Sequence, residues 1–310
     1  MKAAQLTAYG SDGLQVNDAP KPTPQTGQVL VEVYAAAVNP FDWKVRDGHM
    51  KEFIPLQLPA TLGGDLAGVI SEVGEGVEDF SLGQKVYGSA NAVGGQGSLA
   101  EFAPVGIDQL APMPAGIEFA QAAALPLVAT SAYQALVEHM NLQPGQKILI
   151  HGAAGGIGSM AVQIAKQLNA YVAATASAND VDFVKQLGAN EVIDYKAQDF
   201  TKIIKGYDAV FDTVGGDTNT KSYAVLKPGG ILVSMTTPED EPLAKQYQIR
   251  YVQQSSQATS ERLQAVSKLV EAGNLKVNVD KIFPLDQAPQ AFEYLKTGHP
   301  RGKVVIQVKV

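Results

Sequence analysis

A glycine-rich turn is the strongest chemical signal in the sequence. The stretch Lys147–Gly152 is apolar and strand-like, and it runs into Gly152-Ala153-Ala154-Gly155-Gly156-Ile157-Gly158. Glycines let the backbone approach a pyrophosphate, and the start of a helix offers unpaired N–H groups and partial positive charge. The spacing Gly152-x-x-Gly155-x-x-Gly158 predicts a dinucleotide site made by Gly152, Ala154, Gly155, Gly156 and Ile157. The alternative is a tight strand–helix turn that binds nothing.

The end of the following strand bears on which dinucleotide binds. An NAD site usually places Asp or Glu there to hold the ribose 2′-hydroxyl. This sequence has Thr175 and Ser177 instead, which leave room for a 2′-phosphate and favour NADPH over NADH. Asp180, which follows, is interpreted as the cap of the next helix. Val214 lies in a loop after the fourth strand, where ligands collect at the edge of a parallel sheet.

Alternating strands and helices surround these residues. The helix after the turn places Ile157, Met160, Ala161, Ile164 and Leu168 on one face. Such alternation predicts right-handed crossovers and a doubly wound parallel sheet covered on both faces. The expected strands are 147–152, 171–177, 191–195, 207–214, 230–236 and 248–252, and further helices are expected from Asp180, after Thr259 and from Asp286.

The first third of the chain reads differently. It has short β-branched runs, such as 29–34 and 66–73, that are separated by Gly- and Pro-rich turns. This pattern predicts a partly open barrel or sandwich. The final run 304–308 is also strand-like, so we expect it to rejoin the first domain. The predicted domains are therefore 1–118 with 262–310, and 119–261.

Composition excludes several classes of function. The 310 residues include no cysteine and four histidines, none at a metal-ligand spacing, so neither thiol catalysis nor a zinc site is expected. The net charge of −7 and the dispersed Lys and Arg argue against nucleic acid as a partner. No apolar run has the length of a membrane span or of a signal-peptide core, so the protein is expected in the cytoplasm.

Several motifs together resemble one family. They are Ala37–Lys44 (AVNPFDWK), Leu62–Gly68 (LGGDLAG), the glycine turn, the run from Leu187-Gly188-Ala189 to Asp194-Tyr195, and Gly302–Val305 (GKVV). The chain resembles the zinc-independent medium-chain dehydrogenases, in particular the quinone oxidoreductases and enone (alkenal) reductases, essentially from end to end. Zinc-dependent members carry Cys and His-Glu where this chain has Asn39-Pro40 and Gly64-Asp65.

The resemblance implies a GroES-like catalytic domain, a Rossmann cofactor domain and the nicotinamide in the cleft between them. It places Thr130 and Ser131 near the carboxamide, Tyr195 by the adenosine phosphate and Lys303 near the pyrophosphate. It also implies a homodimer. The chain departs from the family at Asn179-Asp180, because these reductases often carry a lysine nearby.

Conjugate reduction delivers hydride to a β-carbon and leaves negative charge on the carbonyl oxygen. A cation or a strong donor aimed at that oxygen lowers the barrier. Lys44 and Asn39 are the candidates, with Asp42 as the residue that orients Lys44 or its loop. The plainer interpretations are a surface lysine, a turn asparagine and a backbone-bonding aspartate.

The function expected is NADPH-dependent reduction of quinones or enones. Two alternatives stay open: a zinc-free carbonyl or alcohol dehydrogenase, and an NADPH-binding regulatory protein that has lost turnover.

Overall fold

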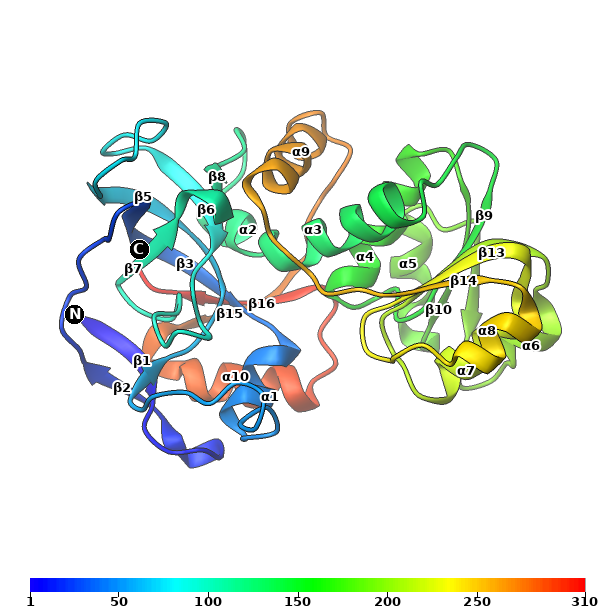
Figure 1. Ribbon diagram of the computed structural model, residues 1–310, viewed down its shortest axis with the longest axis horizontal. Coiled ribbons are helices and arrows are strands. Elements are labelled where there is room, and N and C mark those ends of the chain that lie inside the picture. Colours follow the sequence, from blue (N-terminus) through cyan, green and yellow to red (C-terminus); the bar gives the residue numbers. More distant parts are fainter. Residues whose placement is uncertain (310) are drawn as a thin grey trace. The chain divides into compact units, whose positions relative to one another are not determined.

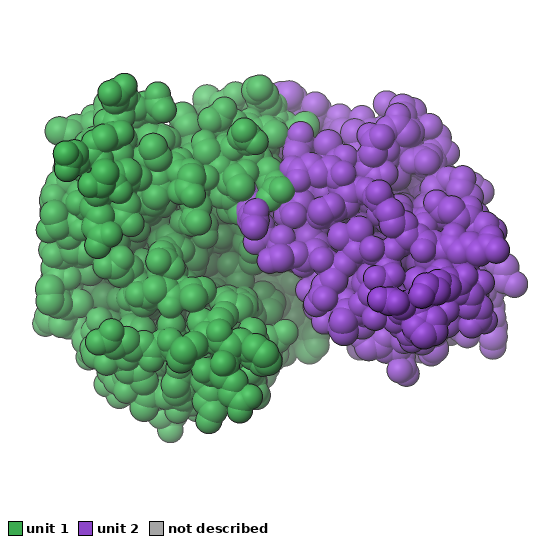
Figure 2. All heavy atoms as spheres, viewed as in Figure 1, with its two compact units in different colours: residues 1–127, 258–271, 277–310 green, residues 128–257, 272–276 purple. Residues whose placement is uncertain are grey.

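The protein consists of two compact units, which Figure 2 distinguishes by colour. The computed structural model describes residues 1–309. Unit 1 comprises residues 1–127, 258–271 and 277–310, and unit 2 comprises 128–257 and 272–276. The domain boundaries expected from the sequence remain a prediction.

Unit 2 is built on a six-stranded parallel sheet in the order β11-β10-β9-β12-β13-β14 (Figure 1). The order reverses beside the first strand, which creates the switch point where doubly wound sheets bind ligands. The prediction of a parallel sheet is therefore confirmed. The strands are β9 (Lys147–Ile150), β10 (Tyr171–Ala176), β11 (Glu191–Asp194), β12 (Tyr207–Asp212), β13 (Leu226–Ser234) and β14 (Arg250–Gln253).

Helices cover the sheet of unit 2. The longest of them, α4, carries the apolar residues that the sequence predicted, and its residues from Gly158 to Ala165 are buried. The helices are α3 (Pro126–Tyr133), which continues into a π-helical stretch (Gln134–His139), α4 (Gly156–Gln167), α5 (Val181–Gln186), α6 (Phe200–Ile203), α7 (Asp217–Ser222) and α8 (Glu241–Tyr247).

Unit 1 holds two sheets rather than one closed barrel among residues 1–309. A small antiparallel sheet runs in the order β2-β1-β4, and a seven-stranded sheet runs β15-β16-β3-β5-β6-β8 with β7 paired to β3. The strands are β1 (Lys2–Leu6), β2 (Leu14–Asp18), β3 (Gln28–Val38), β4 (Ala60–Thr61), β5 (Asp65–Val73), β6 (Lys85–Ser89), β7 (Phe102–Gly106), β8 (Leu110–Pro112), β15 (Val279–Pro284) and β16 (Lys303–Gln307).

The last strand lies beside the first long one, as the sequence predicted. β16 pairs antiparallel with β3 through partners such as Val305 and Ala37. The helices of unit 1 are α1 (Pro40–Arg46), α2 (Phe119–Ala123), α9 (Ser260–Glu271) and α10 (Ala288–Thr297).

The segment that carries Asn39, Asp42 and Lys44 is a helix, so the prediction of a loop there is wrong. Asn39 stands in extended conformation at the N-cap, and Pro40 occupies the first helical position. Proline suits that position because its ring sets φ and its missing N–H would have no partner there. Asp42, at the third position, accepts the Asn39 backbone N–H at 2.7 Å. This contact is half of a capping box.

Candidate active site

The glycine turn in unit 2 leaves no room for side chains at two of its positions. Gly152 has a φ of +68°, and a Cβ there would lie 2.6 Å from Thr213 Oγ1. A Cβ on Gly158 would lie 2.2 Å from the Gly152 carbonyl oxygen. Gly155 is different, because its nearest contact would be an ordinary 3.4 Å. The turn ends where α4 begins, at Gly156, so Ala154, Gly156 and Ile157 surround a helix N-terminus.

The ends of β10 and β11 lie next to each other. Tyr195 follows β11, and its N–H bonds to the Ala176 carbonyl at 3.2 Å, which places it beside Ser177. Tyr195 is 54% exposed, and Lys196 Nζ lies 5.9 Å from the centroid of its ring. Ser177 donates its hydroxyl hydrogen to Asp180 Oδ2 at 2.6 Å. Asp180 occupies the N-cap position of α5, as the sequence predicted, but its side chain makes no capping bond to that helix.

The loop that contains Val214 is held by a buried carboxylate. Asp212, at the end of β12, accepts the N–H groups of Val214 at 2.9 Å and Gly215 at 3.0 Å. Its second oxygen accepts from Asn219 Nδ2 at 2.8 Å. Val214 itself is exposed at the carboxyl edge of the sheet. The sequence placed Val214 in a loop at the sheet edge, but it did not predict that Asp212 shapes this loop.

Thr130 and Ser131 are fully buried on α3. The Ser131 hydroxyl lies 2.6 Å from Ser256 Oγ, and its carbonyl accepts from Gln254 Nε2 at 3.0 Å. Both partners belong to the segment after β14, so these contacts fix α3 against that segment within unit 2.

Unit 1 contains a buried polar cluster that joins the start of α1 to strands β5 and β16. Asn39 donates from Nδ2 to Asp65 Oδ2 at 2.9 Å. Lys303 Nζ contacts Asn39 Oδ1, the Val38 carbonyl at 3.1 Å and Asp65 Oδ2 at 3.2 Å. The other oxygen of Asp65 accepts the Leu127 N–H at 3.0 Å. Every ion and amide in the cluster is thus paired, as burial requires.

The family resemblance implied that Lys303 lies near the pyrophosphate, and this role stays a prediction. Within unit 1 its ammonium group has three hydrogens and three acceptors. Asp65 is the residue whose importance sequence reasoning missed. The available signal was an acid at the start of a strand whose other early residues are apolar and buried.

Asp42 is buried, with 4% of its surface exposed. Burial raises the pKa of its carboxyl group to about 7, and the nearby charge of Asp65 adds to this rise. The Asn39 N–H and the Lys303 ammonium act in the opposite direction. Asp42 therefore exchanges a proton near neutral pH, unlike an ordinary aspartate.

A shallow hollow opens beside Asp42 in unit 1, and its empty space of about 220 Å³ includes open solvent. Asp42 is the one charged residue among those that line it. The residues that line it are Phe41, Asp42, Val45, Ile54, Leu62, Gly63, Ala92 and Val93. Phe41 and Val93 are partly exposed at 36% and 51%.

Lys44 is not among the residues that line this hollow. It lies two positions after Asp42 on α1, and residues two apart on a helix occupy opposite faces. Its Nζ lies 5.8 Å from the centroid of the Trp43 ring, and Lys296 Nζ lies 5.3 Å from the same ring. The structure therefore brings Asn39 and Asp42 together with Asp65 and Lys303, but not with Lys44.

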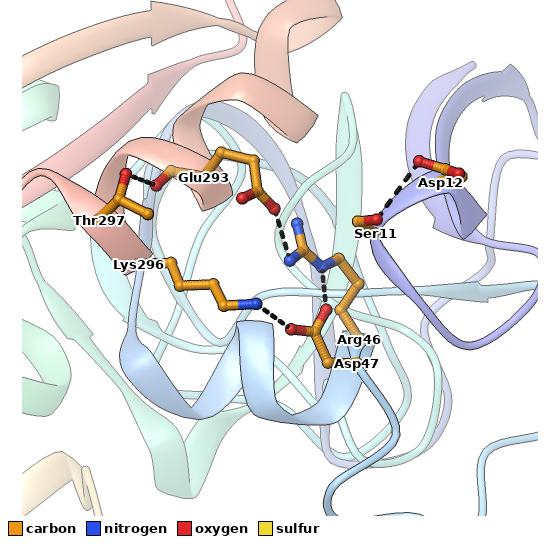
Figure 3. A network of polar contacts seen from close by, with 7 residues as sticks. All are labelled: Ser11, Asp12, Arg46, Asp47, Glu293, Lys296 and Thr297. Carbon is orange, nitrogen blue, oxygen red and sulfur yellow. Dashed lines mark hydrogen bonds and ion pairs between the residues drawn. The ribbon is translucent and has the colours of Figure 1, made fainter.

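Ion pairs fasten the far end of α1 to α10, as Figure 3 shows. The fully buried Arg46 donates from Nε to Asp47 at 2.8 Å and pairs with Glu293 at 2.7 Å. Lys296 reaches Asp47 at 2.8 Å from the same helix as Glu293. The chain continues from α10 into β16, which carries Lys303. Residues of α10 pair with the C-terminal end of α1, and Lys303 contacts Asn39 at its N-terminal end. These contacts fix the position of Asn39.

No metal-ligand cluster of three or more His, Cys, Asp or Glu side chains occurs in residues 1–309. No helix in that range is long and apolar enough to cross a membrane.

The parallel sheet, its glycine turn and the open β-sheets of unit 1 define an oxidoreductase architecture of the alcohol dehydrogenase kind. Residues 25–115 match the family model described as an alcohol dehydrogenase GroES-like domain, and residues 187–306 match the zinc-binding dehydrogenase model. The chain belongs to the medium-chain dehydrogenase/reductase family, together with relatives named as quinone and enone reductases, so the resemblance seen in the sequence is confirmed.

Three similar proteins illustrate the relationship. The chain is 38% identical to an NADPH-dependent alkenal/one oxidoreductase of Arabidopsis thaliana, over 99% of this chain and 79% of the relative. It matches the quinone oxidoreductase structure from Coxiella burnetii with a TM-score of 0.92 and 36% identity, covering 100% and 99% of the two chains. It matches the Escherichia coli quinone oxidoreductase complexed with NADPH with a TM-score of 0.90 and 28% identity, covering 99% and 100%.

Proposed function

We propose that the protein is an NADPH-dependent oxidoreductase that transfers hydride to quinones or to the C=C bond of α,β-unsaturated carbonyl compounds. The observation that carries this proposal is the glycine turn at the start of α4, whose close-packed glycines suit a dinucleotide. The relatives named as quinone oxidoreductase and alkenal/one oxidoreductase supply the acceptor class.

NADPH would supply the hydride. The residues proposed to hold it are Gly152, Ala154, Gly155, Gly156 and Ile157 at the turn, Thr175, Ser177 and Tyr195 at the ends of β10 and β11, Val214 after β12, and Thr130 and Ser131 on α3. The turn N–H groups are suited to the pyrophosphate.

The choice of NADPH depends on charges near Ser177. The Asp180 carboxylate accepts from Ser177 and would repel a 2′-phosphate placed there. Lys196 follows Tyr195 and is the cation at the adjacent strand end, so we assign the phosphate contact to it. A phosphate oxygen that accepts from Ser177 would compete with Asp180 for the same hydrogen.

The acceptor is proposed to bind in the hollow beside Asp42. Asn39 does not line the hollow itself; it uses one Nδ2 hydrogen for Asp65, and we propose that its second reaches the carbonyl oxygen of an acceptor that extends beyond the hollow. Lys303 polarises the same amide from its oxygen side, which makes Nδ2 a stronger donor. Negative charge that develops on the acceptor oxygen would be stabilised in this way. Lys44 is the weaker candidate because it lies on the opposite face of α1.

Asp42 is proposed to orient Asn39 through the backbone N–H that it accepts. We name no dedicated proton donor, because hydroquinone oxygens can be protonated by water. The residues for which we propose catalytic or positioning roles are thus Asn39, Asp42 and Lys303.

The reaction is proposed to need no zinc. A catalytic zinc site normally uses three ligands from Cys, His and acidic side chains, and this chain has no cysteine. Turnover that survives exhaustive chelation, with no zinc in the protein by elemental analysis, supports this proposal. Activity lost on chelation and restored by zinc would contradict it.

Steady-state turnover tests the function itself. Oxidation of NADPH by a quinone or an enone, with little oxidation by a simple aldehyde, supports the proposal. Turnover of the aldehyde instead would favour a carbonyl reductase, and tight NADPH binding without turnover would favour a regulatory protein. The homodimer and the cytoplasmic location also stay predictions, and sedimentation of the purified protein measures the first.

A further inference from the structure

His151 lies immediately before the glycine turn, and its side chain is completely buried. Its Nδ1 lies 3.0 Å from Thr175 Oγ1 at the end of β10, and its Nε2 lies 2.9 Å from Ser222 Oγ at the end of α7. The ring also packs edge-on against Phe200, with the centroids 4.8 Å apart. Both nitrogens therefore have hydroxyl partners from different elements.

The hydroxyl hydrogens fix the direction of these bonds. Ser222 has one hydroxyl hydrogen and donates it to the Thr218 carbonyl at 2.6 Å. The contact with His151 must therefore use a hydrogen on Nε2, with Ser222 Oγ as the acceptor. Burial lowers the pKa of His151 to about 4, against the opposing charge of Asp212, so the ring is neutral and carries this one hydrogen. Nδ1 is then an acceptor, and it receives the hydroxyl hydrogen of Thr175.

The direction of these hydrogen bonds also affects the backbone of the glycine turn. Because Thr175 donates its hydrogen to His151, its Oγ1 lone pairs are free to face the Gly152 N–H, which lies 3.4 Å away. The Thr175 carbonyl accepts the next N–H, that of Ala153, at 3.1 Å. On the other side, Thr213 Oγ1 donates to the His151 carbonyl at 2.8 Å. The chain of bonds runs from Gly152 through Thr175 and His151 to Ser222.

We propose that His151 is a positioning residue of the dinucleotide site, and that its Nε2–H tautomer orients the Thr175 hydroxyl so that the first glycine of the turn is held in register with the end of β10. The proposal rests on the proposed NADPH binding. It gives His151 no contact with the cofactor and no acid–base step. His151 would affect cofactor binding only through the orientation of the backbone N–H groups that bind the pyrophosphate.

The tautomer can be measured in the wild-type protein without any cofactor. Nitrogen-15 NMR of protein labelled at histidine gives four pairs of ring nitrogen signals, since the chain has four histidines with two ring nitrogens each. The spectrum of the His151→Asn variant identifies the pair of signals that belongs to His151. We expect a neutral ring at pH 7 that is protonated on Nε2. A ring protonated on Nδ1, or on both nitrogens, would overturn the proposal.

Three variants separate the two bonds of the ring. His151→Asn keeps an acceptor at the Nδ1 position, His151→Gln keeps a donor near the Nε2 position, and His151→Leu keeps neither. We expect NADPH to bind His151→Asn within a few-fold of wild type, and the other two about tenfold more weakly. Titration of NADPH fluorescence measures this, and thermal unfolding by circular dichroism verifies that each variant is folded.

Equal affinity of the Asn and Gln variants would contradict the proposal, since a merely structural histidine would be affected alike by both changes. If wild type itself fails to bind NADPH, the proposed function is wrong. The NMR result still decides whether the hydrogen-bond chain runs as argued.

Discussion

Replacement of Asp42 by asparagine tests the buried cluster of unit 1. The variant loses the ionisable group but keeps an oxygen that can accept the Asn39 N–H, which the aspartate accepts at 2.7 Å. Burial raises the pKa of Asp42 from 3.8 to about 7. The folded protein therefore binds this proton more tightly than the unfolded chain does.

The sign and size of the effect follow from proton linkage. Between about pH 4 and pH 7 the native state holds more protons than the unfolded state, so the free energy of unfolding falls as pH rises. A shift of about three pKa units corresponds to ~4 kcal/mol. The variant has no ionisable group at this position and does not lose this stabilisation as pH rises. Its free energy of unfolding relative to wild type should therefore rise by ~4 kcal/mol from pH 4 to pH 8.

Urea unfolding of both proteins at pH 4, 6 and 8 measures the difference. Trp43, the only tryptophan, lies beside Asp42 and reports on this unit by fluorescence. Asp79→Asn removes an exposed carboxylate from the same unit and controls for the change in net charge. A difference between Asp42→Asn and wild type that stays constant across the pH range would refute the reasoning.

Three further predictions concern the proposed dinucleotide site of unit 2 and the hollow beside Asp42 in unit 1. Gly158→Ala should abolish NADPH binding, because its Cβ would lie 2.2 Å from the Gly152 carbonyl oxygen. The control variant Gly155→Ala should bind NADPH nearly as wild type does, and fluorescence titration compares the two. Asp180→Asn should strengthen NADPH binding several-fold and leave NADH almost unchanged, since it removes a negative charge beside the expected 2′-phosphate; equal gains for both cofactors would argue against this placement. Val93→Trp should raise KM for the acceptor about tenfold by filling the hollow while Kd for NADPH stays constant, and an unchanged KM would place the acceptor elsewhere.

The parallel sheet was predictable because its signals are local. Each strand of unit 2 is a short apolar run, and each helix between strands has its own apolar stripe, so alternation alone identifies the architecture. Unit 1 was harder to predict, because its short strands pair with distant partners. β1, for example, pairs with β4, which is only two residues long. Pairing of this kind is set by tertiary packing and leaves little periodicity in the sequence.

The candidate site was predictable only where its signals are local in the sequence. Asn39, Asp42 and Lys44 were expected in a loop, although Asn at an N-cap, Pro at the next position and Asp two residues after the Pro is a helix-start pattern. The contact between Asn39 and Lys303 joins residues that are 264 positions apart, and no local pattern encodes it. The opposite directions of Asp42 and Lys44 became predictable only once α1 was known to be a helix.

The most direct test of the central claim is the loss of reduced-nicotinamide absorbance, with NADPH and NADH compared across a quinone, an enone and a simple aldehyde. We predict rapid NADPH oxidation with the quinone or the enone, slower oxidation of NADH, and little turnover of the aldehyde. Faster turnover with NADH would contradict the cofactor assignment at Ser177 and Lys196. The absence of turnover with every acceptor, in a protein that binds NADPH, would contradict the proposed reductase function.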